Sequence, residues 1–537
     1  MHFNKDDLLS WPLYPILFGL YIPLNYFAHN QSLYVFSDAI RSLLIIPLLV
    51  GLLHIILWLV FRRAHFVALA TTLIVGYTVY FRIQLEKEIL FVIVILAATW
   101  LLGRQRIGPN CSRILNVLML VVLVQPIIAI GSFKQAMKVE YVDSLSTSPF
   151  SSIKIDKPQN LSALPTIVHI VLDGYASNDT LLNIFGYDNT PFTDELKQLG
   201  FVVGQNVRAP YNQTLLSMAA IFSGSYLQSG QGPLKEKDLN QLRGTLGLMV
   251  TQGPIQQRLN ELNYNYLAVE TGYNFFPYPD FSTLSGPIFL PEGKNPYETN
   301  LLIFLDILPR ESEPGRTPYN AYLRHAFTTD FYRKQETPFL LHEHILAPHP
   351  PFNIDRDGKD TQQWVNFNTL ADGSHGHKGE PKLIEEYKQG YVEKLRYANG
   401  AFIKHARKLI QDIPAPKIIM VHGDHGSGAY YYPEDLERSC LSERYNTFLA
   451  VYADDPATRK KYTSLESERF NLINLYRLLF DISFGTDMGP LEDQSFFARW
   501  KAPQQLTLLQ DEQIMAACEI QQEISAPSPA LLASGPV

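Results

Sequence analysis

The chain has 537 residues and a formal net charge of −7. A chain of this length exceeds what one hydrophobic core usually holds, so we expect at least two folding units. The modest negative charge, with no basic stripe along the sequence, argues against nucleic acid as a partner.

Five long apolar runs occupy the first part of the chain, at residues 11–28, 42–61, 65–81, 89–102 and 114–130. Most approach the roughly 20 residues that an α-helix needs to cross a bilayer. Such runs also form buried helices in soluble proteins, but five in succession with short polar joints favour membrane spans. The sequence therefore predicts a five-helix transmembrane bundle over residues 1–133.

Basic residues between the runs predict how this bundle is oriented. Arg62 and Arg63 follow the second run, and Arg104 and Arg106 follow the fourth, whereas the third joint contains Glu86 beside a lysine and a second glutamate. Because positive residues gather on the cytoplasmic side, five crossings place everything after the bundle outside the cytoplasm. We expect a multi-pass protein of the bacterial inner membrane, with its remaining domain in the periplasm or outside the cell.

The composition changes near residue 135. Residues 134–164 have little periodicity and are expected to form a linker. From 165 to 502, strand-like segments at 166–172, 264–269, 339–345, 417–421 and 448–452 alternate with helical segments at 191–199 and 384–413. This alternation predicts an α/β domain with a mostly parallel sheet and helices on both faces. Residues 503–537 are expected to be a partly disordered tail.

Acidic residues lie just beyond two of the expected strands, in turns that contain glycine. Asp173-Gly174 comes directly after 166–172, and His422-Gly-Asp424-His425-Gly comes after 417–421. Carboxylates at the carboxyl ends of strands in such a sheet meet in the crevice where ligands bind. Two carboxylates and an imidazole form a ligand set that zinc accepts and manganese tolerates. His169, inside the first strand, is expected to be a core histidine.

A third segment, 210–217, supplies a candidate nucleophile. Thr214 is expected where a loop enters a helix, so that backbone N–H groups and the helix dipole face the group it binds. A metal-bound hydroxyl there can lose its proton and attack phosphorus. Ser217, one turn later, is the alternative hydroxyl, and Asn212 is a candidate substrate-binding residue.

A fourth segment, 342–352, is rich in histidine and proline. His349 is a candidate to protonate the departing oxygen, and both His349 and His344 are candidates to bind the transferred group. Two cysteines, Cys440 and Cys518, would lie on the oxidising side of the membrane, where they either pair or remain as free thiols.

The order Asp173-Gly174, Thr214, the histidine-rich segment and Gly-Asp424-His425-Gly resembles the alkaline phosphatase and sulfatase superfamily, over roughly residues 165–481. The likeness is greatest to its membrane-anchored branch, which includes the phosphoethanolamine and glycerol-phosphate transferases. The resemblance implies that Asp173, Thr214, Asp424 and His425 bind a catalytic metal and that Thr214 becomes transiently phosphorylated.

Three departures refine what the resemblance implies. The common sulfatases carry a Cys-x-Pro-x-Arg type motif at the nucleophile, and Thr214 has none around it. No histidine follows His425, which favours one metal ion over two. The phosphoethanolamine transferases usually present glutamate where this chain has Asp173, which leaves transfer and hydrolysis both open.

We therefore expect a membrane-anchored phosphotransferase or phosphate ester hydrolase. It would use one zinc or manganese ion and act on an envelope lipid or glycan. A sulfuric ester hydrolase and a non-catalytic membrane scaffold are the alternatives. The sequence gives no indication of oligomeric state.

Overall fold

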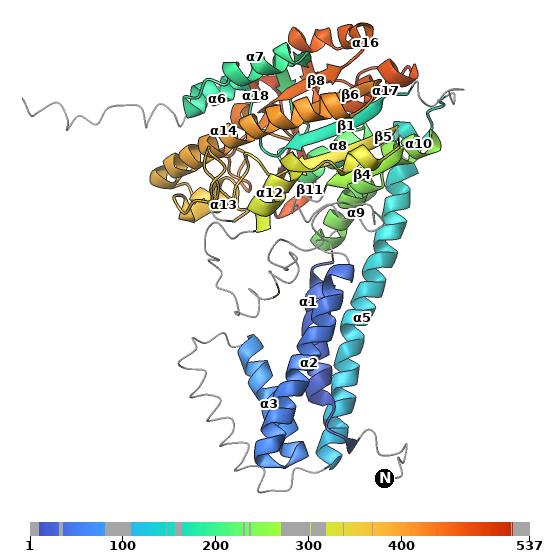
Figure 1. The fold of residues 1–537 in the computed structure, drawn as a ribbon, viewed down its shortest axis with the longest axis vertical. Coiled ribbons are helices and arrows are strands. Elements are labelled where there is room, and N and C mark those ends of the chain that lie inside the picture. The colour runs from blue at the N-terminus through green and yellow to red at the C-terminus, as the bar shows by residue number, and fades with distance from the viewer. Residues whose placement is uncertain are drawn as a thin grey trace, which may run out of the picture. The chain divides into compact units, whose positions relative to one another are not determined.

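The computed structural model describes residues 10–31, 36–80, 109–146, 148–155, 164–228, 231–235, 238–269, 301, 318–336, 338–367, 369–516 and 518. The chain divides into two compact units. One comprises Met1–Val139 with Phe289–Ser312, and the other comprises Glu140–Ile288 with Glu313–Val537. Figure 1 shows the helices of the first unit and the layered α/β architecture of the second, each of which is described here by itself.

The first unit is helical throughout its described elements. They are α1 (Tyr14–His29), α2 (Phe36–Phe61), α3 (Ala64–Tyr80) and α5 (Pro109–Ser146), whose last residues belong to the second unit. Four of the five expected runs coincide with these helices, and the fourth run, 89–102, lies outside the described residues. Within the described part of the chain, only α2 and α5 are long and apolar enough to be candidate membrane spans, so a five-helix bundle is not confirmed.

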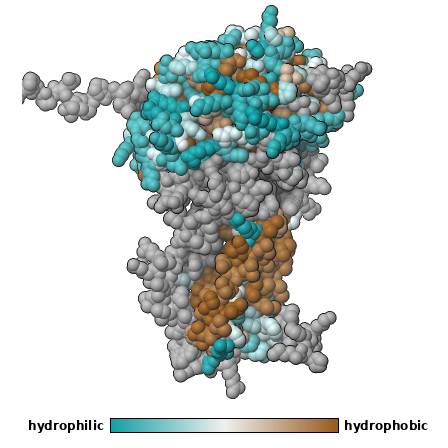
Figure 2. All heavy atoms as spheres, in the orientation of Figure 1, coloured by the Kyte–Doolittle hydropathy of each residue, from teal (hydrophilic) through white to brown (hydrophobic). Residues whose placement is uncertain are grey.

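The two candidate spans carry apolar side chains on their exposed surfaces. Leu44, Leu48 and Ile55 on α2 are between 54% and 71% exposed, and Ile114 and Val121 on α5 exceed 60%. Figure 2 shows the resulting hydrophobic surface over the helical unit. An apolar face of this extent marks a surface for protein or lipid, because soluble monomers rarely expose large contiguous apolar patches.

The second unit is built on a six-stranded sheet in the order β2-β8-β6-β1-β5-β4. These strands are β1 (Thr166–Leu172), β2 (Phe201–Val203), β4 (Asn265–Val269), β5 (Phe339–Ile345), β6 (Lys417–His422) and β8 (Leu449–Ala453). The expected parallel arrangement holds for β6, β1, β5 and β4. It is corrected at β8, which is antiparallel to both of its neighbours, so the sheet is mixed.

Contacts just after β6 explain why β8 runs antiparallel to β6. The Gly423 N–H donates to Phe448 O (3.0 Å), and the Thr447 hydroxyl donates to Gly423 O (3.0 Å). The connection from β6 therefore returns to the edge where β6 ended. A strand that starts at this edge and pairs with β6 must run in the opposite direction, since no crossover carries the chain back to the other edge.

Helices cover both faces of the sheet, as expected, and every side chain of β1 is buried. Val168, Ile170 and Leu172 face one hydrophobic core, and Ile167 and Val171 face the other. The first core includes side chains from α6 (Asn178–Phe185), α7 (Thr190–Gln198), α12 (Pro318–Thr328) and α14 (Pro381–Asp412). The second includes α8 (Thr214–Ser223), α9 (Leu239–Thr251), α10 (Pro254–Glu261) and α17 (Leu475–Phe484).

The remaining elements are short. The small strands are β3 (Asn206–Arg208), β7 (Asn446–Thr447), β9 (Arg469–Asn471), β10 (Phe496–Arg499) and β11 (Ala502–Leu508), and the short helices are α13 (Ser374–His377), α15 (Leu441–Tyr445), α16 (Pro456–Lys460) and α18 (Asp511–Met515). The 3-10 turns are η2 (Pro149–Ser151), η4 (Gly232–Lys235), η5 (Phe331–Lys334), η6 (Val365–Phe367), η7 (Thr463–Glu466) and η8 (Leu472–Asn474).

Regular structure extends into both segments that flank the expected catalytic domain. Helix α5 continues to Ser146, within the expected linker; β11 extends from Ala502 into the expected tail, and α18 lies within that tail. A disulfide joins Cys440 to Cys518 and ties the end of the described chain to the start of α15. The boundaries at 133, 164 and 502 remain predictions.

Candidate active site

The carboxyl ends of three neighbouring strands deliver the central residues of the site. Parallel pairing sets Leu172 opposite Ile345 and Val171 opposite His422. Asp173 therefore leaves β1 beside the end of β5, where its N–H donates to Ile345 O (2.9 Å). Gly174 follows with φ of 71°, a left-handed conformation that glycine adopts without strain. This turn aims the Gly174 N–H at Oδ1 of Asp424 (3.0 Å), across the gap between β1 and β6.

Asp173, Asp424 and His425 form one buried cluster. One potential ligand atom from each lies within 4.8 Å of the others, and all three side chains are nearly inaccessible to solvent. Oδ1 of Asp173 and Oδ2 of Asp424 accept no hydrogen bond from the described residues. Buried polar atoms without partners are rare in folded proteins, so these two oxygens indicate that a further group belongs here.

The electrostatics of the two carboxyls point to a cation. Burial and the neighbouring Asp424 raise the pKa of Asp173 well above its usual value. Burial alone would also raise the pKa of Asp424, but His425, His344 and the Gly174 N–H hold it below its usual value. Two buried carboxylates at this separation disfavour a double negative charge unless a positive charge compensates them. The residues therefore fit a divalent metal ion.

His425 presents a lone pair to the same space. Its Nδ1 donates to Gly426 O (2.9 Å), which leaves Nε2 as the acceptor. Burial and Arg444 lower the pKa of His425 to about 4, so the ring is neutral at physiological pH. Nε2 lies 3.2 Å from Oδ2 of Asp424 and 3.1 Å from Oγ1 of Thr214. This is the tautomer and orientation that a metal-binding histidine requires.

Thr214 is the first residue of α8, which begins where the sequence indicated. Its side chain is 7% exposed, and its hydroxyl donates to Nε2 of His425. The alternative hydroxyl, Ser217, is fully buried and donates to Tyr211 O (2.9 Å), back into the loop that precedes the helix. The structure thus brings Thr214, and not Ser217, into contact with the Asp173, Asp424 and His425 cluster.

The other three expected site residues take different positions. His344 lies in β5 with its Nε2 3.0 Å from Oδ2 of Asp173. His349 turns Nδ1 to Pro350 O (2.7 Å) and Nε2 towards Asp372, 4.0 Å from its carboxylate. The amide of Asn212 contacts the backbone of Ala498 and the hydroxyl of Tyr431, so its described contacts are internal ones.

Three charged residues beside the cluster were absent from the expected site: Asp372, Lys394 and Arg444. Arg444 on α15 donates to Asp372 (2.7 Å) and approaches Nε2 of His425 (3.2 Å). Lys394 on α14 donates to His349 O (2.6 Å). None of the three lies in a recognisable motif, and sequence alone offers only their position between expected strands.

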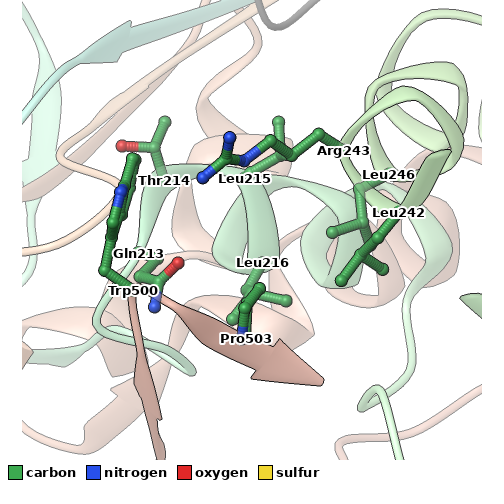
Figure 3. A pocket seen from close by; sticks show the side chains of 9 residues that line it. All are labelled: Gln213, Thr214, Leu215, Leu216, Leu242, Arg243, Leu246, Trp500 and Pro503. Carbon is green, nitrogen blue, oxygen red and sulfur yellow. The ribbon is translucent and has the colours of Figure 1, made fainter. Parts of the chain in front are cut away.

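A pocket adjoins Thr214 on the side of α8 and α9 (Figure 3). Leu242 and Leu246 form its apolar end, and Arg243 and Trp500 lie nearer to Thr214. The guanidinium carbon of Arg243 lies 5.1 Å from the Trp500 ring centroid, a cation–π contact. The complete lining is Gln213, Thr214, Leu215, Leu216, Leu242, Arg243, Leu246, Trp500 and Pro503.

Comparison with known proteins decides the family. The Sulfatase family model matches residues 165–470, more than half of the chain, and this match includes every residue of the cluster. The chain belongs to the sulfatase family. Its members share the alkaline phosphatase-like α/β fold expected from the strand-end motifs. No curated protein sequence matches this sulfatase-family chain.

Several solved structures resemble this sulfatase-family member. The C-terminal periplasmic domain of EcEptC from Escherichia coli is 13% identical, with 64% of this chain and 91% of that one covered and a TM-score of 0.40. The integral membrane lipooligosaccharide phosphoethanolamine transferase A from Neisseria meningitidis is 14% identical, with 90% and 84% covered and a TM-score of 0.37. An alkaline phosphatase superfamily protein from Vibrio parahaemolyticus is 15% identical, with 68% and 81% covered and a TM-score of 0.34.

Proposed function

We propose that this sulfatase-family enzyme is a membrane-anchored phosphotransferase or phosphate ester hydrolase with Thr214 as its nucleophile. The observation that carries the proposal is the contact between the Thr214 hydroxyl and Nε2 of His425, beside two buried carboxylates. An oxygen nucleophile needs a way to lose its proton, and it needs hydrogen-bond donors that stabilise the group it attacks. Thr214 has both, because its hydroxyl contacts a cation-binding cluster and lies at the N-terminus of a helix.

Asp173, Asp424 and His425 would hold one divalent ion, zinc or manganese. When bound, this ion would supply Lewis-acid stabilisation of negative charge on the hydroxyl and on the phosphoryl oxygens. Thr214 would join it as the fourth protein ligand. The unpartnered oxygens of Asp173 and Asp424 and the lone pair of His425 support this assignment from the residues themselves.

The proposed reaction has two steps. The Thr214 hydroxyl releases its proton to solvent, and Oγ1 bonds to phosphorus while the bond from phosphorus to the leaving oxygen breaks, so that a phosphothreonine forms. His349 gives the leaving oxygen a proton. A sugar hydroxyl or water then gives its proton to His349 and bonds to phosphorus while the bond from phosphorus to Oγ1 breaks; Oγ1 regains a proton from solvent, and transfer or hydrolysis is complete. The first N–H groups of α8 donate to the phosphoryl group throughout.

The proposed substrate is a phosphorylated lipid or glycan of the cell envelope. The apolar end of the pocket beside Thr214 supports a lipid, since Leu242 and Leu246 can take the part of the ester that does not react. The exposed apolar faces of α2 and α5 support a membrane anchor in the bacterial inner membrane, with α1 and α3 as further crossings. A periplasmic catalytic unit follows from the arginines between the runs.

Sulfuric ester hydrolysis is the second candidate, because the family match favours it. The absence of a Cys-x-Pro-x-Arg type motif around Thr214 speaks against it. Release of inorganic sulfate from a sulfate ester by the purified enzyme, unchanged in Thr214→Ala, would support this candidate over phosphoryl transfer.

Intact-protein mass spectrometry tests the proposed chemistry. The full-length protein in detergent is incubated with a phosphorylated lipid donor, with and without zinc. We expect an adduct on wild type that is absent from Thr214→Ala. If the wild-type protein turns the donor over without any adduct on either protein, covalent transfer through threonine is excluded.

A further inference from the structure

Arg444 is a buried cation beside the cluster, and protein oxygens hold most of its guanidinium. Nε donates to Asn212 O (2.9 Å), and Nη1 donates to Oδ2 of Asp372 (2.7 Å). Nη1 also lies 3.3 Å from the carbonyl oxygens of two residues that follow His425. The group stacks on Tyr431, with its central carbon 4.0 Å from the ring centroid. The position of Arg444 is therefore determined from several directions.

Nη2 differs from the other two nitrogens of Arg444. Its contact is Nε2 of His425, 3.2 Å away. Because Nδ1 of His425 donates to Gly426 O, Nε2 has one lone pair to offer. The Thr214 hydroxyl, at 3.1 Å, shares that lone pair with Arg444. Two donors thus converge on the atom that would bind the metal ion.

Binding of a cation at Nε2 would take this lone pair from both donors. Thr214 would keep a partner, because its oxygen can itself coordinate the ion. Nη2 would not, since a guanidinium has no acceptor or ligand atom and its other nitrogens are already occupied. A buried N–H next to the cation then needs an oxygen on that side of the site.

We propose that Nη2 of Arg444 donates to an oxygen of the phosphoryl group during transfer to Thr214, which makes Arg444 a catalytic residue. This inference rests on the proposed function and names the residue that neutralises charge beside the metal ion. A phosphoryl group held beside the cation would supply the oxygen that Nη2, 3.2 Å from Nε2 of His425, then needs. The planar guanidinium, fixed through Nε and Nη1, is preorganised for this contact.

Binding measurements separate this role from a purely structural one. Full-length protein in detergent is titrated first with zinc and then, when loaded, with inorganic phosphate by calorimetry. Arg444→Gln should bind zinc as tightly as wild type or several-fold more tightly, because a positive charge beside Nε2 is gone. Its affinity for phosphate should fall by about tenfold or more.

Two further variants complete the experiment. Arg444→Lys keeps the charge but cannot contact Asp372 and the phosphoryl group together, so it should also lose phosphate affinity; it decides the question if Arg444→Gln does not fold. Arg438→Gln is the matched control, because Arg438 also stacks on a tyrosine, Tyr432, with its central carbon 4.1 Å from the ring centroid. It should bind both zinc and phosphate like wild type.

Each outcome has a distinct meaning. The proposal is overturned if Arg444→Lys binds phosphate within twofold of wild type and Arg444→Gln, where it folds, does the same. Loss of zinc affinity in parallel with phosphate affinity also overturns it, since Arg444 would then act only by supporting His425. Failure of wild type to bind zinc would instead contradict the proposed function, which keeps the two claims separable.

Discussion

Nε2 of His344 lies 3.0 Å from Oδ2 of Asp173, and the other oxygen of that carboxylate faces Asp424 and His425. His344 therefore orients the Asp173 carboxylate from the side opposite the proposed metal site. Residues that hold metal ligands in place typically contribute 10–100-fold to metal affinity. The geometry supports such a role for His344 alongside the substrate contact expected from sequence.

Replacement of His344 tests which role dominates. We expect His344→Leu to weaken zinc binding by about 10–100-fold, because Asp173 loses its hydrogen-bond donor while the buried volume remains filled. His344→Gln, which can still donate an N–H, should lose less. Competition with a chromogenic chelator measures both. Unchanged zinc affinity with a raised KM would assign His344 to the substrate.

The two hydroxyls of α8 give a second prediction. Ser217→Ala should retain the phosphothreonine adduct and most of the activity, because the Ser217 hydroxyl is directed to Tyr211 O. Its loss should cost about 1 kcal/mol of stability, the usual value of one buried hydrogen bond. Thr214→Ser, which keeps the oxygen, should form the adduct more slowly. Intact mass and adduct-mapping by peptide sequencing distinguish the two sites, and an adduct on Ser217 in wild type would reverse the assignment.

The strand-end residues could be predicted from sequence because their positions follow from local rules. Asp173 comes directly after β1 and Asp424 follows β6 after a single glycine, and parallel pairing brings the ends of these strands together. His169 could likewise be predicted as a core histidine: Tyr476 (2.8 Å) and His422 (2.7 Å) satisfy its two ring nitrogens.

Arg444 and Lys394 could not be predicted in this way. They reach the site from α15 and α14, and their positions depend on how those helices pack, not on any local pattern. The sequence does not predict the direction of β8 either, for a related reason. A strand of five buried residues has the same sequence pattern in either direction, and its direction depends on long-range contacts, such as those of Gly423 with residues 447 and 448.

Lys394 gives a prediction about stability and pH. It is 2% exposed and donates to His349 O (2.6 Å) and Pro351 O (3.1 Å). Burial lowers its pKa to about 7, against an attraction to Asp173 that raises it. In the unfolded chain its pKa is about 10.4. Below pH 7 both states carry the proton, and the folded state bears the full cost of burying the charge.

Between pH 7 and about pH 10 the folded protein releases this proton while the unfolded chain keeps it. The contribution of Lys394 to the free energy of unfolding therefore rises with pH, by up to about 1.4 kcal/mol per pH unit. Lys394→Met should remove this rise, as measured by urea unfolding of the catalytic unit at pH 7.5 and 9. Lys388→Met, at a partly exposed site on the same helix where the side chain pairs with Glu385, should keep it. An identical pH dependence in Lys394→Met and wild type would contradict the assignment.

The pocket beside Thr214 yields the last prediction. Trp500 is 37% exposed and stacks with Arg243, so Trp500→Ala should leave the fold intact while it opens the side of the pocket nearest Thr214. If the apolar part of a lipid lies there, KM for a lipid phosphate ester should rise about tenfold, equivalent to roughly 1.4 kcal/mol of lost binding. A small water-soluble phosphate ester, which does not fill the pocket, should be turned over with kcat/KM within about twofold of wild type.

Arg499→Gln is the control for this prediction. Arg499 is the neighbouring exposed residue and contacts Gln505, so its replacement should change neither value. Equal losses on both esters would mean that Trp500 supports Thr214 itself, and no loss on either would place the lipid elsewhere.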